Sequence, residues 1–290
     1  MNLEEEIIDG YLVPAKMKRI WAKELDLLRQ FVEVCDKHGL QYRILGGTLL
    51  GAVRHKGYIP WDNDIDVAMF RDDFNKLLEI GPKAFQLPAF FQTTLSEEGR
   101  LFSTYIKIRD SQSTAACVEE FQSGINCGIF IDVFCLDELP DGKFNRWLFV
   151  KQLNSITKMH RFCLDLPPKN GIANKIKYQF QKSIYRLKGS PSAVELFKKY
   201  NQVAGKYWGW GGKEVAHLAF GYHDVYVWNY EDWKDGLSLP FGDDRFVAPK
   251  GYDAILRRQY GDYMRIPDDK STHDYFDFDP DVPYMEYFRR

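Results

Sequence analysis

The segment from residue 44 to residue 69 constrains the fold more than any other part of this 290-residue chain. It places Gly46 and Gly47 a short loop ahead of three aspartates at alternate positions, Asp62, Asp64 and Asp66. Side chains of an extended strand point alternately to its two faces, so the three carboxylates are predicted to share one face. Like charges at this spacing repel each other unless a cation lies among them. Oxygen ligands without a nearby His or Cys favour Mg²⁺ or Mn²⁺, which keep positions open for a substrate's phosphates.

Two familiar ligand loops are excluded by single residues of this segment. Residues 46–52 have the spacing of a P-loop, but Ala52 stands where that loop requires lysine. Residues 62–67 begin like a calcium-binding loop, but Val67 takes the place of its glycine. The pattern that remains is a glycine pair followed by acids on a strand.

The first half of the chain is predicted to alternate between helices and strands. Apolar residues recur at three- and four-residue steps from Ala15 to His38, which predicts an amphipathic helix. A short strand at 42–45 is expected to lead into a turn at the glycine pair and a helix at 48–53. The next expected elements are the carboxylate strand 64–69, a helix at 72–80 with Asp72 as N-cap, and strands at 90–95, 104–109, 114–118 and 129–134. Together they predict an α/β (α+β) fold with a mixed sheet flanked by helices.

The last of these strands carries a single acid, Asp132, inside an otherwise apolar run. A buried carboxylate is costly unless it is paired or ligates a cation. Asp132 is therefore a candidate third acid for the site that Asp64 and Asp66 begin.

Composition changes after Gly142. Residues 142–206 hold fourteen Lys and Arg against two acids, which gives this segment +12 in a chain of net charge -2. Helices are predicted at 144–166, 172–187 and 192–207, and the middle helix carries an apolar stripe flanked by lysines, Ile172, Ile176, Phe180, Ile184 and Leu187. We therefore expect a catalytic core at 1–141, a basic helical insertion at 142–206, and a C-terminal part, 207–290, that completes the core.

The C-terminal part begins with nine aromatic residues between Tyr207 and Trp233. They are expected either to form a cage for a quaternary ammonium group such as choline, or to belong to the core. A hairpin at 237–247, a helix at 252–260 and an irregular acidic tail beyond Pro267 are predicted to follow.

A glycine pair followed by an Asp-Ile-Asp pair, with a further acid on a later strand, resembles the nucleotidyltransferase fold. The longer string from Gly46 to Val67 is more specific and resembles the LicD family, whose eukaryotic relatives include fukutin and fukutin-related protein. Two further stretches match that pattern: Ile-Asp-Val-Phe around Asp132, and Val-Ala-Pro-Lys-Gly-Tyr-Asp followed by Tyr-Gly-Asp-Tyr-Met within 247–264. The resemblance covers roughly residues 20–140 and 240–267. Asn63 departs from it, because many members have Asp there.

The resemblance implies a phosphotransferase that moves phosphocholine or a similar phospho-alcohol from a CDP-activated donor to a hydroxyl of a cell-surface glycan precursor, with release of CMP. Mg²⁺ (or Mn²⁺) is the implied cofactor, and the catalytic and metal-binding residues are Asp64, Asp66 and Asp132. The candidates for substrate binding are Gly46, Gly47, Thr48, Arg54, His55, Lys56, Asp62 and Lys107.

Other interpretations stay open at this point. The acids alone would also fit a solvated turn before a strand, and residues 54–56 would fit an ordinary exposed basic loop. Asp62 could support the metal ligands rather than bind the ion itself. Lys107 and Arg109 are weaker candidates than residues 54–56 for binding phosphate. An alternative enzyme would transfer NMP from an NTP and release pyrophosphate. The non-enzyme alternative is a nucleotide-binding module without turnover.

Charge and cysteine content suggest where the protein acts. A net charge of -2 gives no overall signal for nucleic acid, whereas the basic segment is predicted to face anionic lipid headgroups or a lipid-linked glycan acceptor. Five cysteines, Cys117 among them, form no C-x-x-C pair and fit a reducing compartment. Without a secretory signal pattern, we expect a cytoplasmic protein with peripheral contact at the inner face of the membrane. The histidines, including His217 and His273, lack metal-ligand spacing and are expected to be structural or exposed.

Overall fold

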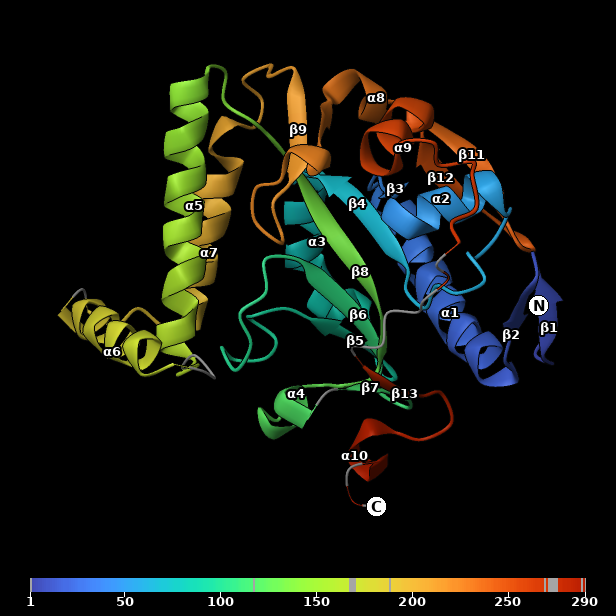
Figure 1. Ribbon diagram of the computed structural model, residues 1–290, viewed down its shortest axis with the longest axis horizontal. Helices are drawn as coiled ribbons and strands as arrows, with labels where there is room; N and C mark the ends of the chain where they lie inside the picture. Colours follow the sequence, from blue (N-terminus) through green and yellow to red (C-terminus); the bar gives the residue numbers. More distant parts are fainter. Residues whose placement is uncertain are drawn as a thin grey trace.

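The computed structural model describes residues 2–116, 118–166, 171–187, 189–268, 270, 276–287 and 289. Cys117, His273, and Pro167 and Pro168, which lie between the first two predicted helices of the basic segment, are outside the described residues. The predicted mixed sheet flanked by helices is confirmed (Figure 1).

A seven-stranded sheet forms the centre of the molecule (Figure 1). The longest strand, β8 (Ile129–Glu138), pairs in parallel with β4 (Asp66–Phe70) on one side. On its other side it pairs antiparallel, first with β6 (Ile106–Asp110) and then with β9 (Glu214–His217). The outer strands are β3 (Arg43–Ile44), β5 (Ala89–Gln92) and β10 (Val227–Asn229). All ten residues of β8 are buried, the acids Asp132, Asp137 and Glu138 as well as the seven apolar residues.

Three helices from the first third of the chain pack on this sheet. Helix α1 (Ala15–His38) has the predicted bounds and ends at Gly39, whose φ of 64° is favoured by glycine. The other two are α2 (Gly46–Arg54) and α3 (Arg71–Ala84). The prediction of Asp72 as N-cap is wrong, because β4 passes directly into α3 and Phe70 takes that position. Asp72 instead lies in the first turn, where the helix dipole favours an acid.

The basic segment folds into the three predicted helices, α5 (Lys143–Cys163), α6 (Ile172–Leu187) and α7 (Ala193–Ala204). Ser192 caps α7 and forms a capping box with Glu195. Helices α5 and α7 lie side by side beyond β9 and share a separate core with it, whereas α6 extends away from the body (Figure 1). The short turns η1 (Gly205–Tyr207) and η2 (Asp224–Tyr226) follow.

The C-terminal part closes over α2. It contains α8 (Tyr230–Lys234), the hairpin β11 (Gly236–Phe241) and β12 (Asp244–Pro249), and α9 (Tyr252–Tyr260) with the predicted bounds. The tail is more regular than expected, since β13 (Asp277–Asp279) pairs with β7 (Thr114–Ala116) while Phe276 packs against Phe130. The peripheral elements are β1 (Glu6–Ile8), β2 (Tyr11–Val13), α4 (Val118–Gln122) and α10 (Tyr284–Tyr287). Of the helices described, none is sufficiently long and apolar to span a bilayer.

Candidate active site

A cavity of about 1000 Å³ opens where α2, β4, β6 and β8 meet. Gly46 and Gly47 line it, together with four carboxylates predicted from the sequence, Asp62, Asp64, Asp66 and Asp132. Lys107 lies on the same wall. Segments distant in sequence complete the lining, since residues 259–265 and the tail aromatics Phe276 and Phe278 contribute to it.

The strand register brings three of the charged residues into a row. Asp66 on β4 lies directly opposite Asp132 on β8, and Lys107 on β6 lies opposite Asp132 from the other side. Cross-strand neighbours share one face of a sheet, so all three side chains point to the cavity. The backbone N–H of Asp132 also donates to the carbonyl of Ile65, at 2.9 Å.

The glycine pair is required by the approach of two carboxylates to the start of α2. A Cβ atom on Gly46 would lie 2.9 Å from Oδ2 of Asp66, and one on Gly47 would overlap Oδ2 of Asp62. Gly46 also has a φ of 58°, which L-residues with side chains rarely adopt. The glycines thus allow the acids to lie against the N-terminal turn of a helix, where the dipole favours negative charge.

Thr48 connects α2 to the acidic strand rather than lining the cavity. Its side chain is buried, and its Oγ1 accepts a hydrogen bond from the backbone N–H of Asp66 at 2.8 Å. The N–H of Leu45 donates to the carbonyl of Asp66 at 3.0 Å. Both bonds fix the position of Asp66 relative to the glycine turn.

The negative charge of the four carboxylates is only partly balanced by neighbouring positive charge. Burial raises the pKa of Asp66 well above its usual range, and the charges of Asp64 and Asp132 raise it further. The pKa of Asp62 is raised by burial and then by the adjacent Asp64. Burial also raises the pKa of Asp132, against the opposing effect of Lys107.

Lys107 is the cation in direct contact with this cluster. Its Nζ lies 2.8 Å from Oδ1 of Asp132 and 3.2 Å from the ring centroid of Phe130. Burial lowers the pKa of Lys107, although Asp132 counteracts that shift. One buried ammonium group therefore partly neutralises one of the four carboxylates.

The donor set of this wall fits a hard divalent cation. Its oxygens come from carboxylates, and their mutual repulsion favours a positive ion among them. In their present rotamers the described His, Cys, Asp and Glu side chains form no group of three or more that could hold a metal ion. Shared coordination would therefore require rotation of the carboxylate side chains.

The basic loop predicted to bind phosphate is divided by the structure. Arg54 lines the cavity, and its guanidinium donates to the carbonyls of Tyr263 and Arg265, at 2.8 and 3.2 Å. The side chain of His55 is buried, with Nδ1 2.7 Å from Oδ2 of Asp9. Lys56 is exposed and is not among the described residues that line the cavity. Only Arg54 of this loop thus reaches the candidate site directly.

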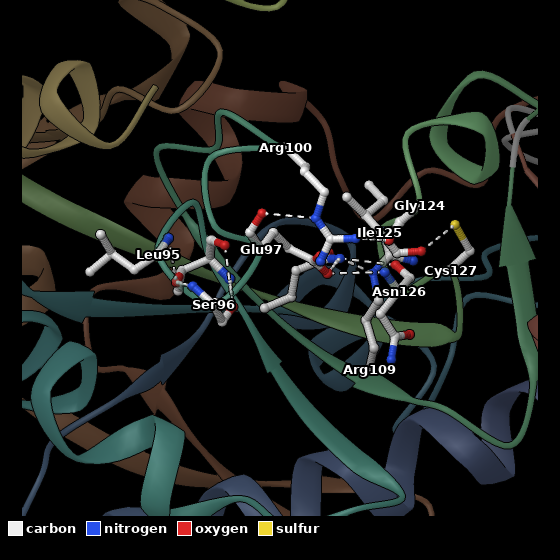
Figure 2. Close-up of polar contacts among 11 residues, drawn as sticks. Leu95, Ser96, Glu97, Arg100, Arg109, Gly124, Ile125, Asn126 and Cys127 are labelled. Carbon is white, nitrogen blue, oxygen red and sulfur yellow. Dashed lines mark hydrogen bonds and ion pairs between the residues drawn. The ribbon is translucent and has the colours of Figure 1, made fainter. Parts of the chain in front are cut away.

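Arg109 belongs to a structural network behind the cavity wall. It is fully buried, donates to Oε1 of Gln92 at 2.6 Å, and binds the carbonyl of Gly128 at 2.9 Å. Gln92 in turn donates to Oε1 of Glu97 at 2.9 Å, and this oxygen also accepts from the backbone N–H of Asn126 at 3.0 Å; Figure 2 shows Glu97, Asn126 and Arg109 close together. These bonds occupy the Arg109 guanidinium, so it is a poor candidate for contact with substrate.

Glu24 on α1 is a site neighbour that the sequence reasoning missed. It is fully buried, and its pKa is raised well above the usual range by burial and then by Asp64. The hydroxyl of Tyr58 donates to Oε2 of Glu24 at 3.0 Å, while Oε1 has no partner among the described atoms. Tyr58 stacks on Trp21, whose Nε1 donates to the carbonyl of Asp62 at 2.8 Å. The sequence feature that could have identified Glu24 is its position on the otherwise apolar face of α1.

Aromatic residues form another part of the cavity lining. Tyr105, Phe134 and Phe220 have ring centroids 5.1 to 5.7 Å apart, and Tyr226 lies in the same lining. The predicted aromatic band is therefore divided, since Phe220 and Tyr226 reach the cavity whereas Trp228 and Trp233 are core residues. His217 also lines the cavity, and burial lowers its pKa to about 4.

The C-terminal stretch predicted to belong to the family pattern reaches the same cavity. Tyr260, Asp262 and Tyr263 line it, and Arg265 adds a cation at its edge. Chain segments about two hundred residues apart thus meet around the carboxylates.

Comparisons with known proteins show which sequences this chain resembles. Residues 39–167 match the profile described as LicD/FKTN/FKRP, nucleotidyltransferase domain. The chain is 25% identical over 288 residues to the lipopolysaccharide cholinephosphotransferase LicD of Haemophilus influenzae, covering 89% of this chain and 97% of that protein. It is 44% identical over 45 residues to human ribitol 5-phosphate transferase FKRP, covering 16% of this chain and 9% of that protein. A protein of Rickettsia prowazekii, RP689, is 43% identical over 87 residues, 30% of this chain and 32% of its own length.

Proposed function

We propose that this chain, whose residues 39–167 match the LicD/FKTN/FKRP nucleotidyltransferase-domain profile, transfers a phospho-alcohol from a CDP-activated donor to a hydroxyl of a cell-surface glycan precursor. Phosphocholine is the first choice, since a relative that matches most of the chain is a cholinephosphotransferase. The observation that carries the proposal is the row of Asp66, Asp132 and Lys107 beside the glycine turn in one cavity.

Asp64, Asp66 and Asp132 are the residues that would hold Mg²⁺ or Mn²⁺. When bound, such an ion would neutralise the donor's diphosphate and align the attacking and leaving oxygens. The helix start at Gly46 and Gly47 and the guanidinium of Arg54 would bind phosphate oxygens from the opposite side.

The transfer step also requires a group that accepts the proton of the attacking hydroxyl. The acceptor hydroxyl oxygen forms a bond to the donor's β-phosphorus while the bridging P–O bond breaks and CMP leaves with the electron pair. Asp132, which lines the cavity on β8, takes the hydroxyl proton. Lys107 would orient the Asp132 carboxylate through their contact of 2.8 Å.

The aromatic part of the cavity lining provides the surface for the donor's alcohol. Tyr105, Phe134 and Phe220 line the cavity with their rings in mutual contact, and a group of aromatic rings suits a quaternary ammonium group. In that case Phe220→Ala should raise KM for CDP-choline about tenfold, a loss on the scale of one cation–π contact. A polyol donor such as CDP-ribitol should be affected less, and equal loss for both donors would contradict the choline assignment.

The test of the function is product analysis. The protein would be incubated with Mg²⁺ and a panel of CDP-alcohols, and separately with NTPs, with and without glycan acceptors. Release of CMP supports the proposal, whereas release of pyrophosphate from an NTP supports the nucleotidyltransferase alternative. An absence of both products with every donor, despite measurable nucleotide binding, would favour the non-catalytic module.

A further inference from the structure

We propose that helix α6, with the adjoining end of α5, is a docking surface for an anionic phospholipid bilayer. The observation is an apolar stripe on α6 that faces solvent although it lies within the most basic part of the chain. Helix α6 lies at the outer end of α5, away from the strands β4, β6 and β8 (Figure 1), and none of its described residues lines the candidate site, so the proposed docking can be tested separately from the transfer reaction.

Helix α6 is attached to the body through one narrow face. Tyr178 and Tyr185, two turns apart, are buried, and their rings lie 5.2 and 5.9 Å from that of Phe162 on α5. The hydroxyl of Tyr178 donates to the carbonyl of Arg161 at 3.2 Å. These contacts fix which side of α6 faces outward.

The outward side carries the stripe. Ile176, Phe180 and Ile184 follow at four-residue steps, so they share one face of the helix, and Leu187 extends it. The exposed fractions are 66% for Ile176, 68% for Phe180 and 88% for Leu187. A helical face of this kind is normally buried, so an exposed one marks an interaction surface.

The charges around the stripe identify the partner. The described residues of 143–187 hold nine Lys and Arg against one acid, Asp165, which gives +8 in a chain of net charge -2. A groove of about 540 Å³ between α5 and α6 is lined by the cations Lys158, Arg161 and Lys177, with no carboxylate among its described lining residues. Such a groove suits the phosphate groups of lipid headgroups.

A bilayer is favoured over other partners because it accounts for both properties. A soluble anionic glycan would explain the cations but gives no reason to expose Phe180 and Leu187. A second copy of the chain would cover the apolar stripe but would bring two strongly positive surfaces together. An interfacial helix combines an apolar face at the acyl boundary with basic residues at the headgroups.

The test is co-sedimentation of the full chain with two kinds of vesicle. One contains phosphatidylcholine alone, and the other includes about one-third phosphatidylglycerol. We expect binding to the anionic vesicles only, and its loss at about 1 M NaCl, where the Debye length falls to about 3 Å. Phe180→Ser with Leu187→Ser should weaken binding at least about tenfold, and Lys175→Glu with Lys177→Glu at least about fivefold per charge.

The control variant removes similar apolar area elsewhere. Phe144 and Trp147 are exposed near the start of α5, about 20 Å along that helix from the groove. Phe144→Ser with Trp147→Ser should leave vesicle binding unchanged. Circular dichroism and a thermal melt must show that each variant is folded, which is expected because all the changed side chains are exposed.

Other outcomes would overturn the docking surface. If Phe180→Ser with Leu187→Ser binds vesicles as well as the wild type does, the apolar stripe does not contact the bilayer. If vesicle binding does not depend on salt, the basic residues do not contribute to it. A dimer in light scattering that Phe180→Ser with Leu187→Ser dissociates would identify a second copy as the occupant. The Asp64→Asn, Asp66→Asn protein should still bind vesicles, so failure of the transferase assignment would be distinguishable from failure of the docking surface.

Discussion

Strand β8 carries two buried aspartates in contrasting electrostatic settings. Asp137 forms a bidentate ion pair with Arg71 on α3, with both N–O distances 2.6 Å. Asp132, five residues earlier and so on the opposite face of the sheet, shares one lysine with a group of neighbouring carboxylates. The fully paired acid joins elements of the fold, since Arg71 also bonds to Asn201 on α7. The partly paired acid lies in the cavity, so incomplete charge compensation distinguishes the candidate site from the framework.

The largest expected effect tests the cavity side of this comparison. Asp64→Asn with Asp66→Asn should lower CMP release at least about a thousandfold, because the metal ligands and their charge are lost. The unfolding free energy should not fall, since repulsion among the carboxylates is relieved. Activity and urea denaturation would be measured together. Asp141→Asn, an exposed carboxylate, is the matched control, and full activity of the double variant would refute the assigned site.

The framework pair should show the opposite behaviour. Asp137→Asn is expected to lower the unfolding free energy by about 3–5 kcal/mol, because it leaves the Arg71 guanidinium buried without its counter-charge. Urea denaturation checks this value. Activity per folded molecule should be largely retained. The double variant Arg71→Met, Asp137→Leu should recover much of the lost stability. If its unfolding free energy is as low as that of Asp137→Asn, simple charge pairing does not explain the effect.

A smaller change should perturb the cavity geometry alone. Gly47→Ala places a methyl group where Oδ2 of Asp62 lies, so the carboxylate must move. Activity is expected to fall about a hundredfold, the scale of a 1 Å misplacement at an active site. The melting temperature should change little. Gly57→Ala serves as the control, because its Cβ would make only an ordinary contact, 3.6 Å from the backbone nitrogen of Gly242; an active Gly47→Ala enzyme would contradict the close packing.

The cavity carboxylates, unlike the Asp137–Arg71 pair, should make the stability of the protein depend on pH and on divalent metal ions. The pKa values of Asp62, Asp66 and Glu24 are raised in the folded state, so their contribution to stability is fully present below their unfolded pKa values of about 4. It is lost as pH rises through the folded pKa values. Without divalent ions, stability from these groups should therefore decrease from acidic to neutral pH.

Added Mg²⁺ or Mn²⁺ should reverse that loss. At about tenfold excess over its Kd the ion would stabilise the protein by about 1.4 kcal/mol near neutral pH, and by less in acid, where protons compete. Thermal melts with Mg²⁺ and with EDTA at several pH values measure this difference. The Asp64→Asn, Asp66→Asn protein should show no metal effect, and an equal effect there would place the ion elsewhere.

The smallest expected effect concerns Glu24. Its raised pKa means that the folded protein favours the neutral carboxyl, which glutamine resembles in shape. Glu24→Gln should therefore change stability by less than about 1 kcal/mol while keeping the hydrogen bond with Tyr58. Glu24→Ala, which leaves a cavity beneath the acids, should be about 2 kcal/mol less stable. Equal losses in the two variants would show that ionised Glu24 is required.

The sequence alone determined the local features of this protein. The apolar periodicity of residues 15–38 predicted a helix with the observed bounds, because a helical face depends on neighbours three or four residues apart, and the helix at 252–260 was predicted to end where Gly261 follows it. The glycine pair and the alternating acids identified the segment that lines the cavity. The basic composition of the segment 142–206 was also evident, since charge needs no fold to be counted.

The tertiary structure decided which of these residues meet. Strand register places Asp132 beside both Asp66 and Lys107, and register depends on packing across the whole sheet. The same long-range packing turns Arg54 toward the cavity, directs His55 to Asp9, and brings Phe276 against Phe130. It also leaves the stripe of α6 in solvent, although the sequence pattern is that of a buried helical face. Local sequence fixes periodicity, whereas burial and charge pairing depend on partners far along the chain.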